Sequence, residues 1–201
     1  MSEQDKREKL VVAATRLFAQ KGYAAVSIRL LAQAANVNSA LVSYYFGGKE
    51  GLYKEVLQSQ FHQVVARIEN IDKALSPIQR LECYAWTMAQ IHQEFPYLLR
   101  FGHSEMTNPT RCFAEIIKPN IARIYQFLHK TVKEGVEAGC FRADVNPGYA
   151  AVALASILNF YFIARPVANS VLGSLENQDG EYVRQAIELY LHGLERRQEN
   201  E

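Results

Sequence analysis

The fold of this 201-residue chain is decided by residues 27–49, which read SIRLLAQAANVNSALVSYYFGGK. The first part, from Ser27 to Ala34, has apolar residues at helical spacing, and its serine is suited to cap a helix. Asn36 follows where the chain must turn, and asparagine adopts the left-handed conformation more readily than most residues. A second helix is expected to begin two or three residues later and to end near Phe46. The stretch therefore predicts two short helices joined by a tight turn.

The second of these helices has two different faces. Asn38 or Ser39 is expected to cap its start. Val42 and Phe46 are four residues apart, so they share one face, which we expect to be buried. Ser39 and Ser43 share the opposite face, which is small and polar. A helix that lies in the major groove of DNA needs such a face, because small residues allow close approach to the base edges.

Three segments between Ala14 and Tyr53 read ATRLFAQKGYAAVSI, AANVN and YYFGGKEGLY. Together they resemble the DNA-binding head of the tetracycline-repressor (TetR) family of transcription regulators. Asn36 departs from the family pattern, where glycine is usual, and Ser43 replaces a frequent tyrosine or asparagine. The resemblance implies an all-α protein with a three-helix head at residues 1–50, followed by a helical body at residues 51–201 that binds an effector and forms a dimer.

The resemblance also implies which residues contact DNA. Arg29 can bind guanine through two hydrogen bonds, and Ala40 and Leu41 can contact thymine methyl groups. The tyrosines and the lysine of the set are expected to hold phosphates, which fix the register of the complex. The alternative role for Tyr45 is core packing, and for Lys49 it is a solvated helix start. The predicted DNA-binding residues are Ser27, Arg29, Asn38, Ser39, Ala40, Leu41, Ser43, Tyr44, Tyr45 and Lys49.

Charge is distributed unevenly along the chain, although the net charge is only +1. Residues 1–54 contain eight basic and four acidic side chains, a net charge of +4, and the remainder carries −3. A positive head on an acidic body is expected of a module that places one end on phosphates. Chance is the alternative explanation at these magnitudes.

Composition predicts the cellular setting. Cys83, Cys112 and Cys140 form no C-x-x-C pair, so we expect neither a disulfide framework nor a zinc site, and free thiols fit a reducing cytosol. The polar N-terminus predicts no signal peptide. The longest apolar run, residues 149–164, is shorter than the roughly 20 residues of a membrane helix. We therefore expect a cytoplasmic protein with no membrane, metal or cofactor partner.

Helical spacing and cap signals predict about nine helices and no strand. Gly22 is expected to end the first helix, and Pro119 to kink or divide a long one. Ser76, Pro77 and Gln79 combine an N-cap, a proline at the first helical position and a capping box. The expected helices are 5–21, 27–34, 38–46, 49–71, 77–94, 96–106, 110–138, 147–171 and 179–197.

The last two predicted helices carry more apolar residues than one stripe can hide. One head contacts too little DNA for tight specific binding, and paired heads spaced by about one DNA turn require a dimer. The resemblance implies a four-helix interface built from these two helices of each subunit. The alternative is the ordinary core of a monomer. The predicted interface residues are Ala151, Leu154, Leu158, Phe162, Val183, Ile187, Tyr190, Leu191 and Leu194.

Residues 84–127 are rich in bulky side chains with a few polar ones among them. An apolar cavity with a few polar groups suits a small organic effector, although such a stripe is also typical of plain core. The predicted pocket residues are Trp86, Met88, Phe101, His103, Met106, Phe113, Tyr125 and Asn159.

Three functions compete. The leading hypothesis is a repressor that is released from a palindromic operator when a small organic effector binds the body. The second is a DNA-binding dimer without an effector, whose body serves dimerisation or protein docking. An enzyme is disfavoured, because the sequence has no nucleophile elbow, no H-E-x-x-H and no clustered carboxylates.

Overall fold

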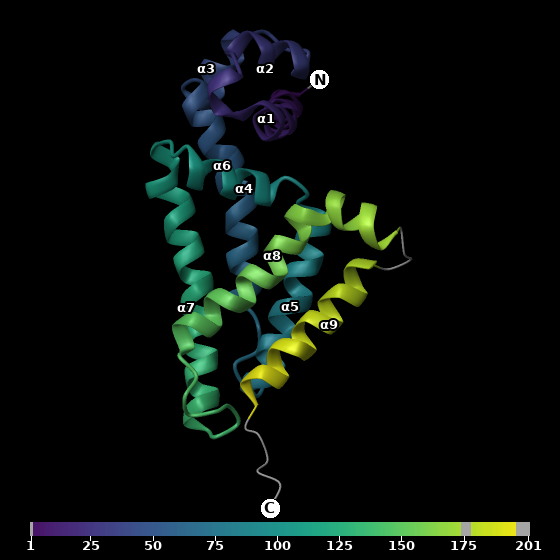
Figure 1. Ribbon diagram of the computed structural model, residues 1–201. Helices are drawn as coiled ribbons and strands as arrows, with labels where there is room; N and C mark the ends of the chain where they lie inside the picture. Colours follow the sequence, from purple (N-terminus) through teal and green to yellow (C-terminus); the bar gives the residue numbers. More distant parts are fainter. Residues whose placement is uncertain (1, 174–177, 196–201) are drawn as a thin grey trace, which may run out of the picture. The chain divides into compact units, whose positions relative to one another are not determined.

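The computed structural model describes residues 2–173 and 178–195, and this part of the chain is all-α (Figure 1). Its elements are α1 (Glu3–Ala25), α2 (Ile28–Ala35), α3 (Ala40–Phe46), α4 (Lys49–Glu69), α5 (Pro77–Glu94), α6 (Leu98–Thr107), the π-helix η1 (Phe113–Ile117), α7 (Lys118–Glu137), α8 (Pro147–Leu172) and α9 (Gln178–Leu194). The predicted fold class is confirmed. The predicted end of the last helix, near residue 197, lies outside the described residues.

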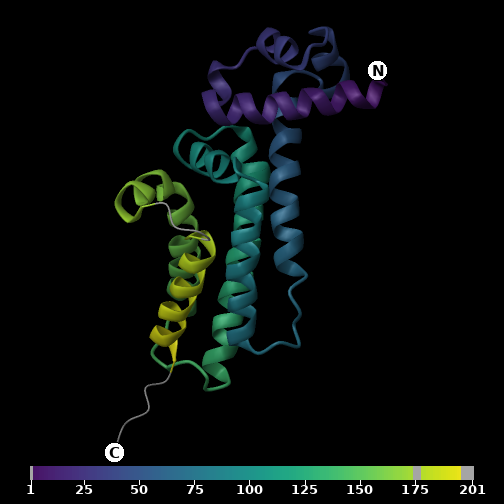
Figure 2. The same cartoon turned by 90° about the vertical axis from the view of Figure 1, so that its right-hand side faces the viewer.

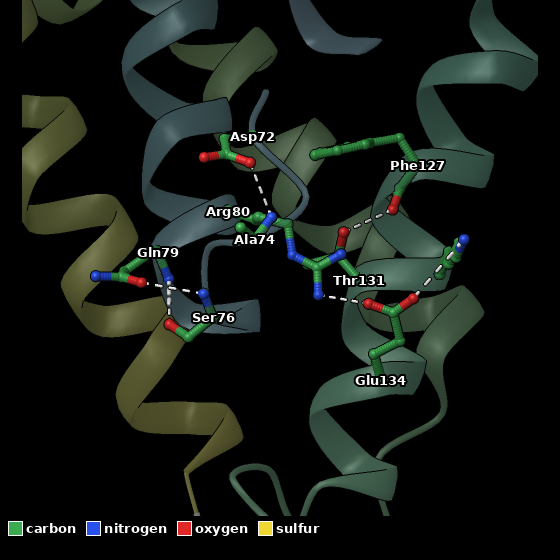
Figure 3. Close-up of polar contacts among 9 residues, drawn as sticks. Asp72, Ala74, Ser76, Gln79, Arg80, Phe127, Thr131 and Glu134 are labelled. Carbon is green, nitrogen blue, oxygen red and sulfur yellow. Dashed lines mark hydrogen bonds and ion pairs between the residues drawn. The ribbon is translucent and has the colours of Figure 1, made fainter. Parts of the chain in front are cut away.

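The predicted helix starts have the expected caps. Ser76 Oγ accepts from the backbone N–H of Gln79 at 3.3 Å, and Gln79 Oε1 accepts from the backbone N–H of Ser76 at 3.0 Å (Figure 3). Asn146 Oδ1 accepts from the N–H groups of Gly148 and Tyr149 at 2.9 and 3.1 Å. Each cap satisfies backbone donors that have no partner within the helix, so both starts are fixed by the local sequence.

Pro119 divides the helix predicted at 110–138. The chain forms η1 first, and the N–H of Lys118 donates to the carbonyl of Phe113, five residues back. A proline has no N–H, and its ring clashes with the carbonyl four residues earlier. The wider π turn accommodates both effects, so α7 begins at Lys118. The first helix differs from its prediction, because α1 continues past Gly22, where the backbone departs from helical geometry.

The chain divides into two compact units, one of Met1–Gln63 with Tyr97–Asn120 and one of Val64–Pro96 with Ile121–Glu201. The first unit thus includes α6 and η1 as well as the predicted head. Tyr53 Oη donates to the buried carboxylate of Glu105 at 2.7 Å, and Thr110 donates to the same carboxylate from its N–H and its hydroxyl. These bonds attach the C-terminal end of α6 to the first turns of α4.

A tight corner connects α3 to α4. Gly47 and Gly48 have φ angles of 71° and 128°, which only glycine adopts without strain. A Cβ added at Gly51 would lie 1.8 Å from the backbone oxygen of Phe46. The backbone of α4 therefore touches the end of α3 directly, and the corner accepts no side chain at this position.

The second unit is built from α5, α8 and α9 packed on one another, together with α7 and the end of α4. Figure 2 shows α8, in green, beside α9, in yellow. Their inward stripes are the residues that the sequence analysis assigned to the dimer interface. The buried ones are Ala151, Leu154, Leu158, Val183, Ile187, Tyr190, Leu191 and Leu194.

The remaining predicted interface residue, Phe162, is half-buried, and its ring lies 4.5 Å from that of His92 inside the same unit. The predicted interface residues therefore contribute to the core of the chain itself. A different set of large apolar side chains is exposed on α8 and α9, namely Tyr149, Val152, Ile157, Phe160, Ile163, Val167, Val171 and Leu189.

Helix α8 is longer than the apolar run recognised in the sequence. It continues past residue 164 as one helix to Leu172. By length and composition, Pro147–Val171 could cross a membrane, with a mean hydropathy of 1.5 over an 18-residue window. Only 28% of that window is buried, because the exposed apolar residues follow one side of the helix. An exposed stripe of this kind marks a surface that something covers.

The α3–α4 corner generates a stability prediction. Gly51→Ala is expected to destabilise the protein by about 1–3 kcal/mol, because the new methyl group must displace backbone. Gly193→Ala is the control, since that glycine is exposed in α9 with nothing within 4 Å of its Cβ position. It should be neutral or stabilise by up to ~1 kcal/mol. Chemical denaturation followed by circular dichroism measures both, and equal effects of the two changes would contradict this description of the corner.

Candidate nucleic-acid interface

The turn between α2 and α3 has the geometry expected from its sequence. Ser27 Oγ accepts from the N–H of Leu30 at 3.2 Å and caps α2. Asn36 lies in the left-handed region, with φ 52° and ψ 52°. Asn38 Oδ1 accepts from the N–H of Ala40 at 2.8 Å, whereas Ser39 makes no side-chain cap bond. Of the two predicted caps for α3, Asn38 therefore provides the hydrogen bond.

The two faces of α3 separate as predicted. Val42 is fully buried and Phe46 is half-buried. On the outside, Ser43 is exposed and the ring of Tyr44 is 70% exposed. Leu41 is half-buried at the edge of this outer face. The exposed residues on this side of the turn and helix are Asn38, Ser39, Ala40, Ser43 and Tyr44, all of them uncharged.

The predicted phosphate-binding residues differ in their surroundings. Lys49 Nζ donates to the backbone oxygen of Tyr23 at 3.0 Å and lies 4.2 Å from the centroid of its ring. It thus joins the start of α4 to the end of α1, a structural role that the sequence did not indicate. Tyr45 is half-buried, with its ring 5.0 Å from that of Tyr44. Arg29 is exposed on α2.

The predicted effector residues do not share one environment. Phe101, His103, Met106 and Phe113 belong to the first unit, and the other four belong to the second. His103, Met106 and Trp86 are exposed to solvent rather than enclosed in the core. Trp86 instead lines a surface groove of about 350 Å³ between α5 and α9. Phe101 packs in the core, 6.3 Å from the ring of Tyr53.

The remaining predicted effector residues of the second unit lie around the inner side of α5. Met88 is buried there, one turn from His92, whose Nε2 lies 2.8 Å from Asn159 Oδ1. Burial lowers the pKa of His92 to about 4, so the ring is neutral at pH 7, although its bond to Asn159 opposes the shift. Tyr125 is half-buried on α7.

The predicted effector residues did not include two other residues on the inner side of α5. Arg80 and Tyr84 precede Met88 by eight and four residues, so all three share one side of α5. Both are buried. The signal was present, since a charged residue in register with a buried stripe is unusual.

Residues 2–173 and 178–195 contain no group of three or more histidine, cysteine, aspartate or glutamate side chains that could hold a metal ion.

Known proteins resemble this chain in sequence and in fold. Residues 10–56 match the model of the tetR family of bacterial regulatory proteins. The probable HTH-type transcriptional regulator YttP of Bacillus subtilis is 30% identical over 134 residues, which are 64% of this chain and 64% of that protein. The HTH-type transcriptional repressor NicS of Pseudomonas putida is 24% identical over 170 residues, 83% of this chain and 80% of its own. The match to YttP thus spans just under two thirds of that relative's length.

Solved structures extend the likeness over the whole chain. PfmR, a TetR family transcriptional regulator from Thermus thermophilus, aligns with a TM-score of 0.78 and 25% identity, covering 95% of this chain and 98% of that one. A tetR-family regulatory protein from Rhodococcus shares the fold with a TM-score of 0.80. These relatives are transcription regulators and not enzymes. In its helix-turn-helix head and its all-helical fold, the chain is similar to the tetR family of bacterial regulatory proteins.

Proposed function

We propose that the protein is a DNA-binding repressor that a small organic effector releases from a palindromic operator. The observation that carries the proposal is the outer face of α3, which is exposed, uncharged and mostly small, while Val42 anchors the opposite face in the core. Such a helix can lie in the major groove with its outer residues against base edges. Arg29 on α2 is free in solvent to bind guanine. The relative NicS is itself described as a repressor.

We further propose that two copies of the chain pair through the exposed apolar stripe of α8. Tyr149, Val152, Phe160, Ile163 and Val167 are spaced by three, four or eight residues, so they lie on one side of the helix. A second copy of the same stripe would cover it, as a two-fold interface requires. The resulting pair of heads matches a two-fold symmetric DNA site. A cytoplasmic location follows from the need to reach the operator.

The effector would act through α4. This helix begins directly after the head, and its residues 49–63 belong to the first unit while residues 64–69 belong to the second. A ligand that prefers one conformation of the second unit can therefore bias the position of the head through one continuous helix. Met88, Tyr125 and Asn159 remain the predicted residues of that effector site.

The alternative is a DNA-binding dimer without an effector, whose second unit serves only dimerisation or protein docking. The exposure of Trp86, His103 and Met106 favours this alternative, because an enclosed pocket would bury such side chains. Thermal denaturation against a compound library separates the two, since a ligand that binds the folded state raises the melting temperature.

The direct test of DNA binding is selection from a random pool of duplexes by the purified protein. The proposal predicts enrichment of a two-fold symmetric sequence whose half-sites are about one helical turn, roughly 10 base pairs, apart or a multiple of it. No enrichment at low salt would overturn it.

Arg29→Ala should weaken binding to the selected duplex by roughly 1–3 kcal/mol and relax the preference at one base pair of each half-site. Arg100→Ala is the matched control, because Arg100 is also exposed but lies on α6. Gel-shift titrations against single-base variants of the duplex measure both effects. Unchanged affinity in the Arg29 variant would remove this residue from the interface.

Lys49→Met should weaken binding to all duplexes alike and reduce the salt dependence, by about one unit of log–log slope if the ammonium group contacts a phosphate. Its bond to the Tyr23 carbonyl predicts a lower melting temperature as well. A changed sequence preference would show instead that Lys49 reads bases.

Phe160→Glu places a charge in the centre of the exposed stripe and should shift the protein from dimer to monomer in analytical ultracentrifugation, because a buried, unpaired charge opposes association. Val12→Glu is the control, since Val12 is equally exposed but lies on α1. If the Phe160 variant stays dimeric with a native circular dichroism spectrum, the stripe is not the interface.

A further inference from the structure

Two buried side chains of α5 keep hydrogen-bond donors without an acceptor. Tyr84 is 0% exposed and Arg80 is 7% exposed. Within the part of the chain that the structure describes, the Tyr84 hydroxyl and the Arg80 Nε have no hydrogen-bond partner. A buried polar group without a partner lowers the stability of the folded protein, so such groups are rare in native structures. Here the two groups lie four residues apart, on the same side of one helix.

Both donors face the seam between α5 and α7. Arg80 Nη2 binds the carboxylate of Glu134 on α7, and the ring of Tyr84 lies 6.4 Å from that of Phe127. Thr131, also on α7, is buried and lies between Phe127 and Glu134 in the sequence. Figure 3 shows its side chain beside the Arg80 guanidinium. The backbones of α5 and α7 approach each other less closely than those of α5 and α9. Long side chains rather than backbone contacts therefore fill this seam.

The charged side chains in the seam would allow another anion to replace Glu134 at Arg80. The side chain of Arg80 is 9% exposed, whereas that of its partner Glu134 is 36% exposed. Lys130 Nζ lies 3.8 Å from the other oxygen of the same carboxylate, so two cationic groups share one anion. The guanidinium is held inside the protein, and the more exposed Glu134 can turn outward into water when another anion takes its place at the guanidinium. Burial raises the pKa of Tyr84, so its hydroxyl keeps its proton and remains a donor at neutral pH.

We propose that the seam between α5 and α7 binds the carboxylate of a small organic acid, with Arg80 and the Tyr84 hydroxyl as donors and Glu134 as the anion it displaces. A carboxylate has only acceptor oxygens, and the forked guanidinium matches its two oxygens. Met88, one turn further along α5, offers apolar surface for the rest of the molecule. This inference rests on the proposed effector function and specifies the chemical class of the effector.

Thermal denaturation of the full chain tests the site with two pairs of probes, octanoate beside octanamide and phenylacetate beside phenylacetamide. The carboxylates, but not the neutral amides, are expected to raise the melting temperature. Tyr84→Phe removes only a hydroxyl without a partner, so the free protein should keep or gain stability while its affinity for the carboxylate falls about five- to tenfold. The opposite signs of these two effects distinguish a ligand contact from a structural role.

Two further variants complete the test. Glu134→Gln should lower the melting temperature of the free protein, because it leaves the guanidinium without its anion, and should raise carboxylate affinity, because it removes the competitor. Tyr53→Phe is the control, since its buried hydroxyl donates to the Glu105 carboxylate at 2.7 Å and belongs to the first unit. That variant should lose stability without any change in carboxylate affinity.

Equal shifts with acids and amides, no shift with either acid, or an unchanged affinity in Tyr84→Phe would overturn the proposal. A destabilised Tyr84→Phe protein without a ligand effect would assign the hydroxyl to an internal water. Operator binding by the ligand-free protein is measured separately, so loss of the carboxylate site leaves the proposed DNA binding standing, and a failure to bind DNA leaves the ligand result intact.

Discussion

The structure depends on how one very short helix is held. Helix α3 has seven residues, too few for a stable helix in water by itself. The left-handed Asn36 fixes its beginning, the buried Val42 anchors its middle, and the Gly47–Gly48 corner fixes its end. The same restraints that bury one face of α3 leave the opposite face in solvent. A surface that can contact DNA is therefore a consequence of how the helix is stabilised.

In the second unit, helix α8 also has one buried side and one exposed side, but its exposed side is apolar. Helix α8 is apolar on most sides, and one side packs on α5 and α9 within the chain. The opposite side, from Tyr149 to Val171, is left with large apolar residues in water. A chain with such a stripe gains free energy when another apolar surface covers it. The proposed dimerisation and the proposed DNA binding would thus both use helices that have two different faces.

Local signals in the sequence predicted many of the helix ends and turns. Caps at Ser27, Ser76 and Asn146, the turn at Asn36 and the division at Pro119 depend on neighbouring residues, so they could be inferred without a structure. Periodicity also separated the two faces of α3 correctly. It could not say which of the apolar faces of α8 meets which partner. The roles of Lys49, Arg80 and Tyr84 depend on contacts between distant segments, which spacing along the chain does not encode.

The proposed function requires the outer face of α3 to contact the bases of DNA. This contact can be measured by titrating the isotope-labelled protein with a selected duplex and recording nuclear magnetic resonance spectra. We expect the backbone amide signals of Ala40, Ser43 and Tyr44 to shift with the duplex, while the signals of exposed residues on α6 stay in place. Shifts confined to another surface, with α3 unchanged at saturating duplex, would show that α3 is not the DNA-binding surface.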